Sequence, residues 1–422
     1  MTRIRLGRLL TGLLLPASQL AGQESPTFTS TVFTRYSDRV VKIQVVESGS
    51  AAKAGVGSGF FVSNRGHIVT NYHVIADLIH HPARYRAELA DTTRATEVLT
   101  ILAIDVVHDL AVVRTDRPTP RYFPLRPATA RQGDRLYALG HPSDLGLSIV
   151  EGTHNGLLRH TLYPKVHFTG SLNPGMSGGP AISADGRVIG INVSTFGEQL
   201  SFLVPVERAI ALMGVVLAPG YHPPDSFLED VGRQLTAYQD VYLKDLFTAP
   251  TQTVELGPYR VVTEPAPFFR CWGDADQPKE LPYAWADHEC STDDYVYIAS
   301  EQESGVVELT HELISTKSLS APRFFALYTS TFGRDNTPGG DEEHVTSWRC
   351  GTRNVRNAAA PLRAVLCLRR YRKLGALYDA VLKIAVLGRR DAGLVSTLVL
   401  SGATFANITL LTGRYLDGIT WR

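Results

Sequence analysis

The chain has 422 residues, of which 44% are hydrophobic and 20% are charged, and its formal net charge is +1. This is ordinary globular composition, and the length suggests two or three domains. The balanced charge gives no reason to expect nucleic acid or an anionic membrane surface as the main partner.

The first 22 residues have the layout of a secretory signal peptide. A basic start with Arg3, Arg5 and Arg8 precedes the apolar run 9–15, and small residues follow. This run is too short to span a bilayer. We therefore expect residues 1–22 to direct export to the periplasm or the extracellular medium, with no membrane span later in the chain. A buried N-terminal helix is the alternative interpretation.

Short apolar stretches alternate with turn signals from about residue 38 to residue 205. Residues 40–46 read as one strand, and residues 59–63 and 67–70 read as a hairpin around an Asn-Arg-Gly turn. Regularly spaced short strands with few helices favour an antiparallel barrel or sandwich. The stretch is long enough for two small barrels packed together.

The strongest local signal is the string Gly-Met-Ser-Gly-Gly-Pro at residues 175–180. A serine between glycines sits on a tight turn, where the amides of Gly175 and Ser177 can point at one spot and hold an oxyanion. The string also fits the nucleophile elbow of α/β-hydrolases. In that elbow a helix follows the serine, and the acid and the histidine come later in the chain. Here Pro180 leads into a strand, and the best partners precede the serine.

The candidate base is His73, in Thr-Asn-Tyr-His-Val, and the candidate acid is Asp109, in His-Asp-Leu-Ala-Val-Val. A lone histidine beside a strand is more often a packed or exposed residue, and a lone aspartate before a strand is more often a cap. The order His73, Asp109, Ser177, with each residue in a matching local string, favours a catalytic triad instead.

Taken together, these motifs show that the region 35–215 resembles the trypsin-like serine proteases, and that it is most similar to their bacterial HtrA/Deg branch. The pieces that carry the resemblance are Gly57-Ser58-Gly59-Phe60, residues 70–74, residues 109–112, Leu139-Gly140-His141-Pro142, residues 175–180, Ile189-Gly190-Ile191-Asn192 and residues 202–205. The resemblance implies a mainly β fold, in which residues 30–215 form a double six-stranded antiparallel β-barrel with the active site between the barrels.

The resemblance also implies a role for each residue of the site. His73 takes the proton from Ser177 and later gives it to the leaving amine, while Asp109 holds the imidazole in the right tautomer. The amides of Gly175 and Ser177 form the oxyanion hole. The implied enzyme is a serine endopeptidase that acts on protein or peptide substrates and needs no cofactor and no metal.

The resemblance places the substrate on a strand and beside a small pocket. Three consecutive residues are expected to pair with an extended substrate backbone: Asn192, Val193 and Ser194. Ser171 would form the floor of the specificity pocket, with Leu200 and Phe202 on its wall. Because no acid is evident there, we expect cleavage after small or medium aliphatic residues. Met176 replaces the aspartate that binds a new N-terminus in digestive relatives, so we expect no zymogen switch of that type.

Residues 216–254 read as a linker and an amphipathic helix. Asp225 or Ser226 can cap this helix, and its apolar residues recur at helical spacing: Leu228, Val231, Leu235, Tyr238 and Tyr242. Residues 255–422 read as a separate α+β domain that ends in a helix. HtrA proteins usually carry a PDZ domain after the protease, but no carboxylate-binding glycine loop is recognisable here after residue 215.

All four cysteines lie in this last region. Export implies an oxidising compartment, so two disulfides are expected, and of the three possible connectivities we favour the local one, Cys271 with Cys290 and Cys350 with Cys367. A zinc site is a poorer alternative, because no C-x-x-C spacing occurs. The basic run at residues 369–373 is expected to be a solvated strand face, with an anionic partner as the alternative. A non-catalytic relative that keeps the fold as a peptide-binding module is the main competitor to the enzyme.

Overall fold

The structure is a computed structural model. It describes residues 27–421 with the exception of 91–95, 159–160, 196–198, 244–245, 247–251, 277, 279, 293 and 301. The predicted signal peptide, residues 1–22, lies outside this part of the chain. In the described part, no helix is long and apolar enough to cross a membrane.

The first half of the predicted double barrel is a seven-stranded antiparallel sheet, in the order β5-β4-β1-β2-β3-β7-β6. Its strands are β1 (Val40–Glu47), β2 (Lys53–Phe61), β3 (His67–Thr70), β4 (Tyr85–Leu89), β5 (Glu97–Val98), β6 (Thr100–Asp105) and β7 (Leu110–Arg114). We call it the N-terminal sheet. The expectation of six strands is not met here, because Leu99 separates the two-residue β5 from β6. The amide of Leu99 donates to the carbonyl of Ala87 in β4 at 2.8 Å, and the chain continues from Leu99 directly into β6, so that Leu99 links the two ends of the sheet.

The second half is a closed six-stranded barrel, as predicted, in the order β10-β13-β12-β11-β8-β9. Its strands are β8 (Arg135–Gly140), β9 (Ser148–Leu157), β10 (Val166–Thr169), β11 (Pro180–Ile182), β12 (Val188–Thr195) and β13 (Ser201–Pro205). We call it the second barrel. Short helices flank the two halves: α1 (Phe28–Tyr36), η1 (Ser37–Arg39), α2 (Tyr72–His80), η2 (Pro142–Asp144) and α3 (Val206–Val216).

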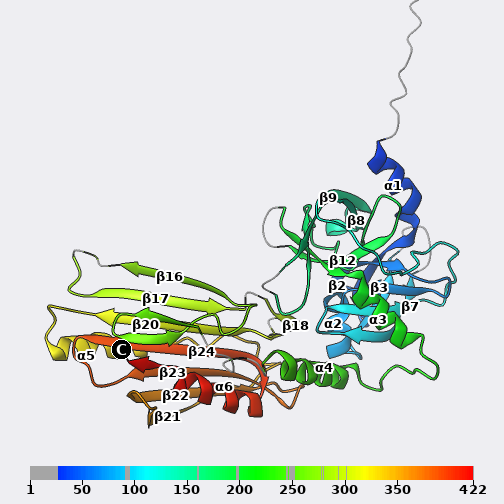
Figure 1. The fold of residues 1–422 in the computed structure, drawn as a ribbon. Helices are drawn as coiled ribbons and strands as arrows, with labels where there is room; N and C mark the ends of the chain where they lie inside the picture. The colour runs from blue at the N-terminus through cyan, green and yellow to red at the C-terminus, as the bar shows by residue number, and fades with distance from the viewer. Residues whose placement is uncertain are drawn as a thin grey trace, which may run out of the picture.

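The predicted amphipathic helix is α4 (Phe227–Tyr242). The hydroxyl of Ser226 accepts a hydrogen bond from the amide of Glu229 at 3.2 Å, and so it caps the first turn. Val231 and Leu235 are buried on the inner face of the helix. In Figure 1, α4 lies at the base of the molecule between the barrels and the C-terminal sheet.

The C-terminal unit, residues 253–421, is built around a seven-stranded antiparallel sheet in the order β16-β17-β20-β24-β23-β22-β21. These strands are β16 (Arg270–Asp276), β17 (Ala284–Ser291), β20 (Val307–Ser315), β21 (Arg349–Arg356), β22 (Pro361–Arg370), β23 (Leu377–Val386) and β24 (Ala392–Thr404). Smaller elements complete it: β14 (Thr253–Leu256), β15 (Tyr259–Val262), β18 (Val296–Ala299), β19 (Gln302–Ser304), α5 (Ala321–Phe332), α6 (Phe405–Asp417) and β25 (Thr420–Trp421).

Both faces of the middle of this sheet are covered, whereas its edge strands β16 and β21 are mostly exposed. Leu394 and Leu398 of β24 lie in one core cluster with residues of α6, whereas Val395 lies in another with Phe324 and Tyr328 of α5. The alternation follows the two-residue period of a strand. It explains why β23 and β24 are buried at nearly every residue.

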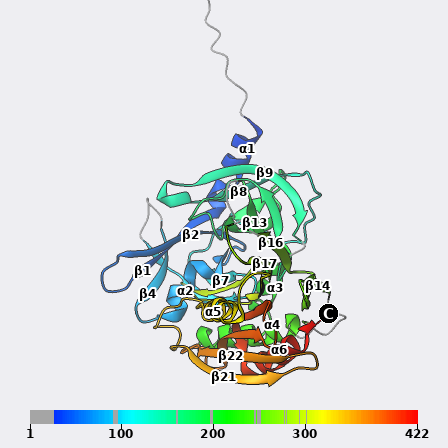
Figure 2. The same ribbon diagram turned by 90° about the vertical axis from the view of Figure 1, so that its left-hand side faces the viewer.

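The C-terminal unit also shares a hydrophobic core with the N-terminal sheet. One cluster joins Ile75 and Ile79 of α2 to Val231 of α4 and to Val296 and Ile298 of β18. The two regions therefore pack directly against each other. In Figure 2 the molecule is turned so that the C-terminal unit faces the viewer.

Both predicted disulfides are present, Cys271–Cys290 and Cys350–Cys367. Each joins directly opposed residues of neighbouring strands, β16 with β17 and β21 with β22. The two cysteines of each pair are only 19 and 17 residues apart in the sequence, which confirms the local pairing that we favoured.

The basic run 369–373 is only in part the solvated strand face that the sequence suggested. Arg369 and Tyr371 are buried, with 8% and 1% of their surfaces exposed. Arg369 Nε forms an ion pair with Asp379 at 2.7 Å, and Lys373 pairs with Glu343 at 3.0 Å. β22 ends at Arg370, and Arg370, Arg372 and Lys373 are exposed. The expectation of a solvated face is therefore wrong for Arg369 and Tyr371 and holds for the other three residues.

Candidate active site

Asp109 clamps His73 through both of its carboxylate oxygens. Asp109 Oδ1 accepts from the backbone amide of His73 at 2.8 Å, and Oδ2 lies 2.6 Å from ring Nδ1. Asn71, which precedes helix α2, donates from its side chain to the Asp109 carbonyl at 2.7 Å. Asp109 has φ of +53°, a left-handed conformation that aspartate tolerates better than most residues. Because Nδ1 is engaged as a donor to the carboxylate, ring Nε2 is left as the basic atom.

Burial and charge act in opposite directions on His73. Burial opposes protonation of the ring, but the Asp109 carboxylate and its hydrogen bond outweigh this, and the pKa of His73 is raised from its usual 6.5. The His73 side chain keeps 28% of its surface exposed. A reacting group can therefore reach the ring.

The loop around Ser177 needs its glycines. Gly175 and Gly178 have φ of +95° and +85°. A Cβ at Gly175 would lie 2.4 Å from the carbonyl oxygen of His141, and a Cβ at Gly179 would lie 2.1 Å from that of Leu139. Side chains at these positions would push the loop away from the barrel.

Two buried polar side chains hold this loop in place. The Ser58 hydroxyl on β2 donates to the carbonyl of Gly175 at 2.7 Å and accepts from the amide of His141 at 2.8 Å. The side-chain amide of Asn192 on β12 donates to the carbonyls of Leu139 at 3.0 Å and Met176 at 3.2 Å. The N-terminal sheet and the second barrel thus both fix the position of the loop.

The two predicted oxyanion donors are available. Among the described residues, neither the amide of Gly175 nor that of Ser177 donates to a protein acceptor. The neighbouring amide of Met176 is used within the loop, where it donates to the carbonyl of Asn173 at 3.0 Å. Two free N–H groups on one loop, of which one belongs to the serine itself, are an arrangement that can bind an oxyanion.

Ser177 lies where the two halves meet. The backbone carbonyl of Ser177 accepts from the amide of Ser58 at 2.8 Å, and a Cβ at Gly178 would lie 3.0 Å from the amide nitrogen of Asn71, two residues before His73. The Ser177 hydroxyl donates to the carbonyl of Val193 at 3.4 Å, and no hydrogen bond joins it to His73 in the described contacts. For proton transfer to His73 Nε2, the hydroxyl must leave Val193.

The residues that follow Ser177 form β11, beginning at Pro180, and not a helix. The nucleophile elbow of an α/β-hydrolase requires a strand-to-helix turn at this position. The α/β-hydrolase alternative is therefore excluded.

Comparison with known proteins agrees with this geometry. Residues 57–191 match the trypsin-like peptidase domain family. The chain contains a trypsin-like peptidase domain. It is 32% identical over 195 residues to mitochondrial serine protease HTRA2 of Bos taurus, a match that covers 43% of this chain and 41% of the relative. It is 30% identical over 209 residues to the probable periplasmic serine endoprotease DegP-like of Halomonas elongata, covering 46% of this chain and 42% of the relative.

A solved structure, the serine endoprotease from Yersinia pestis, aligns with a TM-score of 0.40 and 27% identity, covering 47% of this chain and 70% of that one. The chain thus spans only about two fifths of the length of the bovine and Halomonas relatives that it matches. The recognised peptidase domain ends well before the C-terminal unit.

The residues predicted to bind substrate occupy different environments around the peptidase domain. The backbone N–H and C=O of Asn192 are hydrogen-bonded to Gly179 and Gly178, both at 2.9 Å, and its buried side chain holds the serine loop, so Asn192 has no free backbone group for the substrate pairing that we expected. Val193 lies at an irregularity in the pairing of β12 with β13 and offers its carbonyl to Ser177. Ser171 is exposed on the loop before the serine, and Leu200 and Phe202 are half-buried. The side chain of Ser194 lies outside the described part.

Sequence reasoning missed two residues beside the triad of the peptidase domain. Ser58 was visible as part of the motif Gly57-Ser58-Gly59-Phe60, but its link to Gly175 was not. Tyr297 had no signal at all, because it belongs to the C-terminal unit. Its ring packs edge-on against the His73 ring, with centroids 6.0 Å apart and planes inclined at 73°.

Proposed function

We propose that the protein is a serine endopeptidase in which Ser177 is the nucleophile, His73 the general base and Asp109 the residue that orients it. The observation that carries this proposal is the double contact of Asp109 with His73, which leaves Nε2 basic. The free amides of Gly175 and Ser177 support it. Relatives named serine proteases support the same chemistry.

The reaction follows from these positions. Ser177 Oγ attacks the peptide carbonyl carbon, its proton passes to His73 Nε2, and the oxyanion is held by the amides of Gly175 and Ser177. The C–N bond then breaks as His73 returns the proton to the leaving amine, and the substrate acyl group remains on Oγ. Water, deprotonated by His73, releases the acid and regenerates the serine.

The substrate is expected to bind beside the serine loop in an extended conformation. An extended chain is expected to pair with the segment Val193–Ser194, beyond the last residue of β12 that β11 engages, Ile191. A small or medium aliphatic residue before the cut remains our prediction, since Ser171, Leu200 and Phe202 supply no charge. Export to an oxidising compartment is likewise proposed, supported by the two disulfides and by the periplasmic relative.

A fluorophosphonate probe tests the nucleophile. We expect the folded protein to carry one label, located by mass spectrometry on the peptide that contains Ser177. Ser177→Ala should carry none. The competing peptide-binding role predicts the opposite result: wild-type protein that stays unlabelled beside a labelled control protease would overturn the enzyme proposal.

A further inference from the structure

The hairpin formed by β18 and β19, residues 296–304, leaves the C-terminal unit and reaches the helix that carries His73. In Figure 1 the strand β18 lies between the C-terminal sheet and the barrels. Tyr297 contacts the ring of His73 and also the ring of Tyr72, at a centroid distance of 6.5 Å. Val296 and Ile298, on the other face of the strand, are buried in the core shared with α2.

A single carbonyl of the hairpin binds both ends of helix α2. The Tyr72 hydroxyl donates to the carbonyl of Ile298 at 2.8 Å, and His80 Nε2 lies 3.1 Å from the same oxygen. Burial is the main cause that lowers the pKa of His80 to about 4, so this ring is neutral at physiological pH and donates from Nε2. The helix, and with it His73, is thereby fixed against the hairpin.

The segment that leads into the hairpin binds the other half of the active site. Asp294 Oδ1 pairs with Lys165 Nζ at 2.6 Å, and Oδ2 accepts from the amide of Leu162 at 3.1 Å. The side chains of Lys165 and Asp294 are only 10% and 8% exposed. Leu162 and Lys165 directly precede β10 of the second barrel, the half that carries Ser177. The hairpin and the segment before it therefore contact both halves of the active site.

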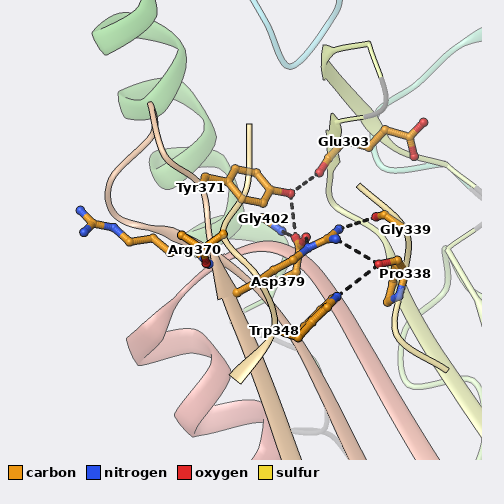
Figure 3. A network of polar contacts seen from close by, with 10 residues as sticks. Glu303, Pro338, Gly339, Trp348, Arg370, Tyr371, Asp379 and Gly402 are labelled. Atoms are coloured by element: carbon orange, nitrogen blue, oxygen red, sulfur yellow. Dashed lines mark hydrogen bonds and ion pairs between the residues drawn. The ribbon is translucent and has the colours of Figure 1, made fainter. Parts of the chain in front are cut away.

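A buried polar network anchors the base of the hairpin, as Figure 3 shows. The Tyr371 hydroxyl lies 2.7 Å from the carbonyl of Glu303 in β19 and 2.7 Å from Asp379 Oδ1. Asp379 also accepts from Arg369 Nε at 2.7 Å and from the amide of Gly402 at 2.9 Å. The hairpin is therefore supported by the sheet strands β22, β23 and β24.

We propose that this hairpin completes the active site, with Tyr297 as a positioning residue for His73. The inference rests on the proposed function and extends it, because it makes the C-terminal unit part of the catalytic apparatus. The hairpin does not close the site, since His73 keeps its 28% exposure. Tyr297 contacts His73 as a neutral side chain at physiological pH, because burial is the main cause that raises the pKa of Tyr297 to about 12.

The test uses the full chain and three variants. Tyr297→Ala removes the ring that contacts His73, and Tyr297→Phe keeps the ring and removes only the hydroxyl. Tyr283→Ala is the matched control, because Tyr283 is another half-buried tyrosine of the C-terminal unit that packs near α5. We expect kcat on a peptide substrate to fall about 10- to 100-fold in Tyr297→Ala, with little change in KM, because small displacements of a catalytic group cost this much. Tyr297→Phe and Tyr283→Ala should match wild type.

The pH profile separates positioning from a general loss of stability. Among the described contacts, the ionisable groups that meet the His73 ring are Asp109 and Tyr297. Removing the Tyr297 ring lets water reach the imidazole, which relieves the burial that opposes its protonation. The acid limb of kcat/KM should therefore move to higher pH in Tyr297→Ala and stay in place in Tyr297→Phe and Tyr283→Ala.

A second variant keeps the inference testable if Tyr297→Ala does not fold. Tyr371→Phe retains the buried ring but removes the hydroxyl at the base of the hairpin, and it should lower kcat in the same direction by a smaller factor. Fluorophosphonate labelling of wild-type Ser177 first establishes the nucleophile, so a failure of the proposed function would be seen separately. If wild-type protein is labelled, unchanged kcat and an unchanged pH profile in Tyr297→Ala and in Tyr371→Phe would overturn the inference. Increased activity in Tyr297→Ala would overturn it as well.

Discussion

The peptidase domain and the C-terminal unit differ in how their residues are marked in the sequence. His73, Asp109 and Ser177 lie in short sequence motifs. The glycines of these motifs are required by close backbone contacts, and their polar residues form hydrogen bonds that hold the site. Tyr297 and Ile298 lie in an ordinary strand and yet contact the helix that carries His73. The comparison shows that residues which react are recognisable from local chemistry, whereas residues that support them are recognisable only from their contacts.

The largest expected effect sharpens the chemical side of this comparison. Asp109→Asn should lower kcat by about 10⁴-fold, because the amide cannot hold His73 in the tautomer with a basic Nε2. The chain offers a matched control in Asp105, which binds His108 Nδ1 at 2.7 Å without a serine nearby in the described contacts. Asp105→Asn should leave kcat close to wild type. Equal losses in the two variants, measured with one peptide substrate, would contradict the assignment of Asp109.

The second effect concerns the oxyanion donors. Gly175→Ala should lower kcat by about 10²–10³-fold, because the new Cβ would displace the loop and its amide from the substrate. Gly133 has the same φ of +95° but open space around it, so Gly133→Ala isolates the cost of the strained backbone. Steady-state kinetics on both variants decides the matter: similar activity in the two would argue against a role for the Gly175 amide.

The third effect is a pH dependence. The base must be neutral, and the pKa of His73 is raised by Asp109 despite its burial. Activity should therefore be lost as pH falls, with a midpoint of kcat/KM above the usual histidine value of 6.5. A profile that is flat between about pH 5 and 8 would exclude His73 as the base.

The smallest expected effect on activity comes from the far edge of the C-terminal unit. Replacing Cys350 and Cys367 together by serine should lower the free energy of unfolding by about 3 kcal/mol, as expected for a closed loop of this length. The disulfide joins β21 and β22, at the edge of the sheet opposite to β16 and two strands away from β24, which contacts β19 of the hairpin. Denaturant unfolding should reveal the loss, while kcat of the folded protein stays unchanged. A large fall in kcat would show that the hairpin is not the only route by which this unit supports the site.

Much of the fold was predictable because its signals are local. The strand spacing, the cap at Ser226, the apolar stripe of α4 and the pairing of the four cysteines all depend on neighbours within a few tens of residues. The closed second barrel followed from the family resemblance. The strand count of the N-terminal sheet did not, since a single residue, Leu99, decides whether β5 and β6 form one strand or two.

The parts that sequence could not supply depend on distant pairing. The basic run 369–373 looked solvated, because nothing in the sequence indicates that Asp379 would pair with Arg369 inside the sheet. Asn192 was assigned to backbone pairing with the substrate, because its position on a strand does not reveal that Gly178 and Gly179 already use its N–H and C=O groups. The contact of Tyr297 with His73 joins residues more than 200 positions apart, and no local pattern encodes it.

The central claim is that His73 Nε2 and Ser177 Oγ act on the same substrate carbonyl. Peptidyl chloromethyl ketones test it directly, because the ketone carbon bonds to the serine oxygen and the methylene carbon alkylates the histidine. With a panel that carries small aliphatic residues before the ketone, we predict one reagent molecule per protein, bonded through its methylene carbon to His73 in place of the chloride that leaves. Alkylation should be much slower in Ser177→Ala, because the serine hemiketal that brings the methylene carbon to His73 cannot form. Reaction at another histidine, or no reaction with any reagent that modifies a control HtrA-type protease, would contradict the account.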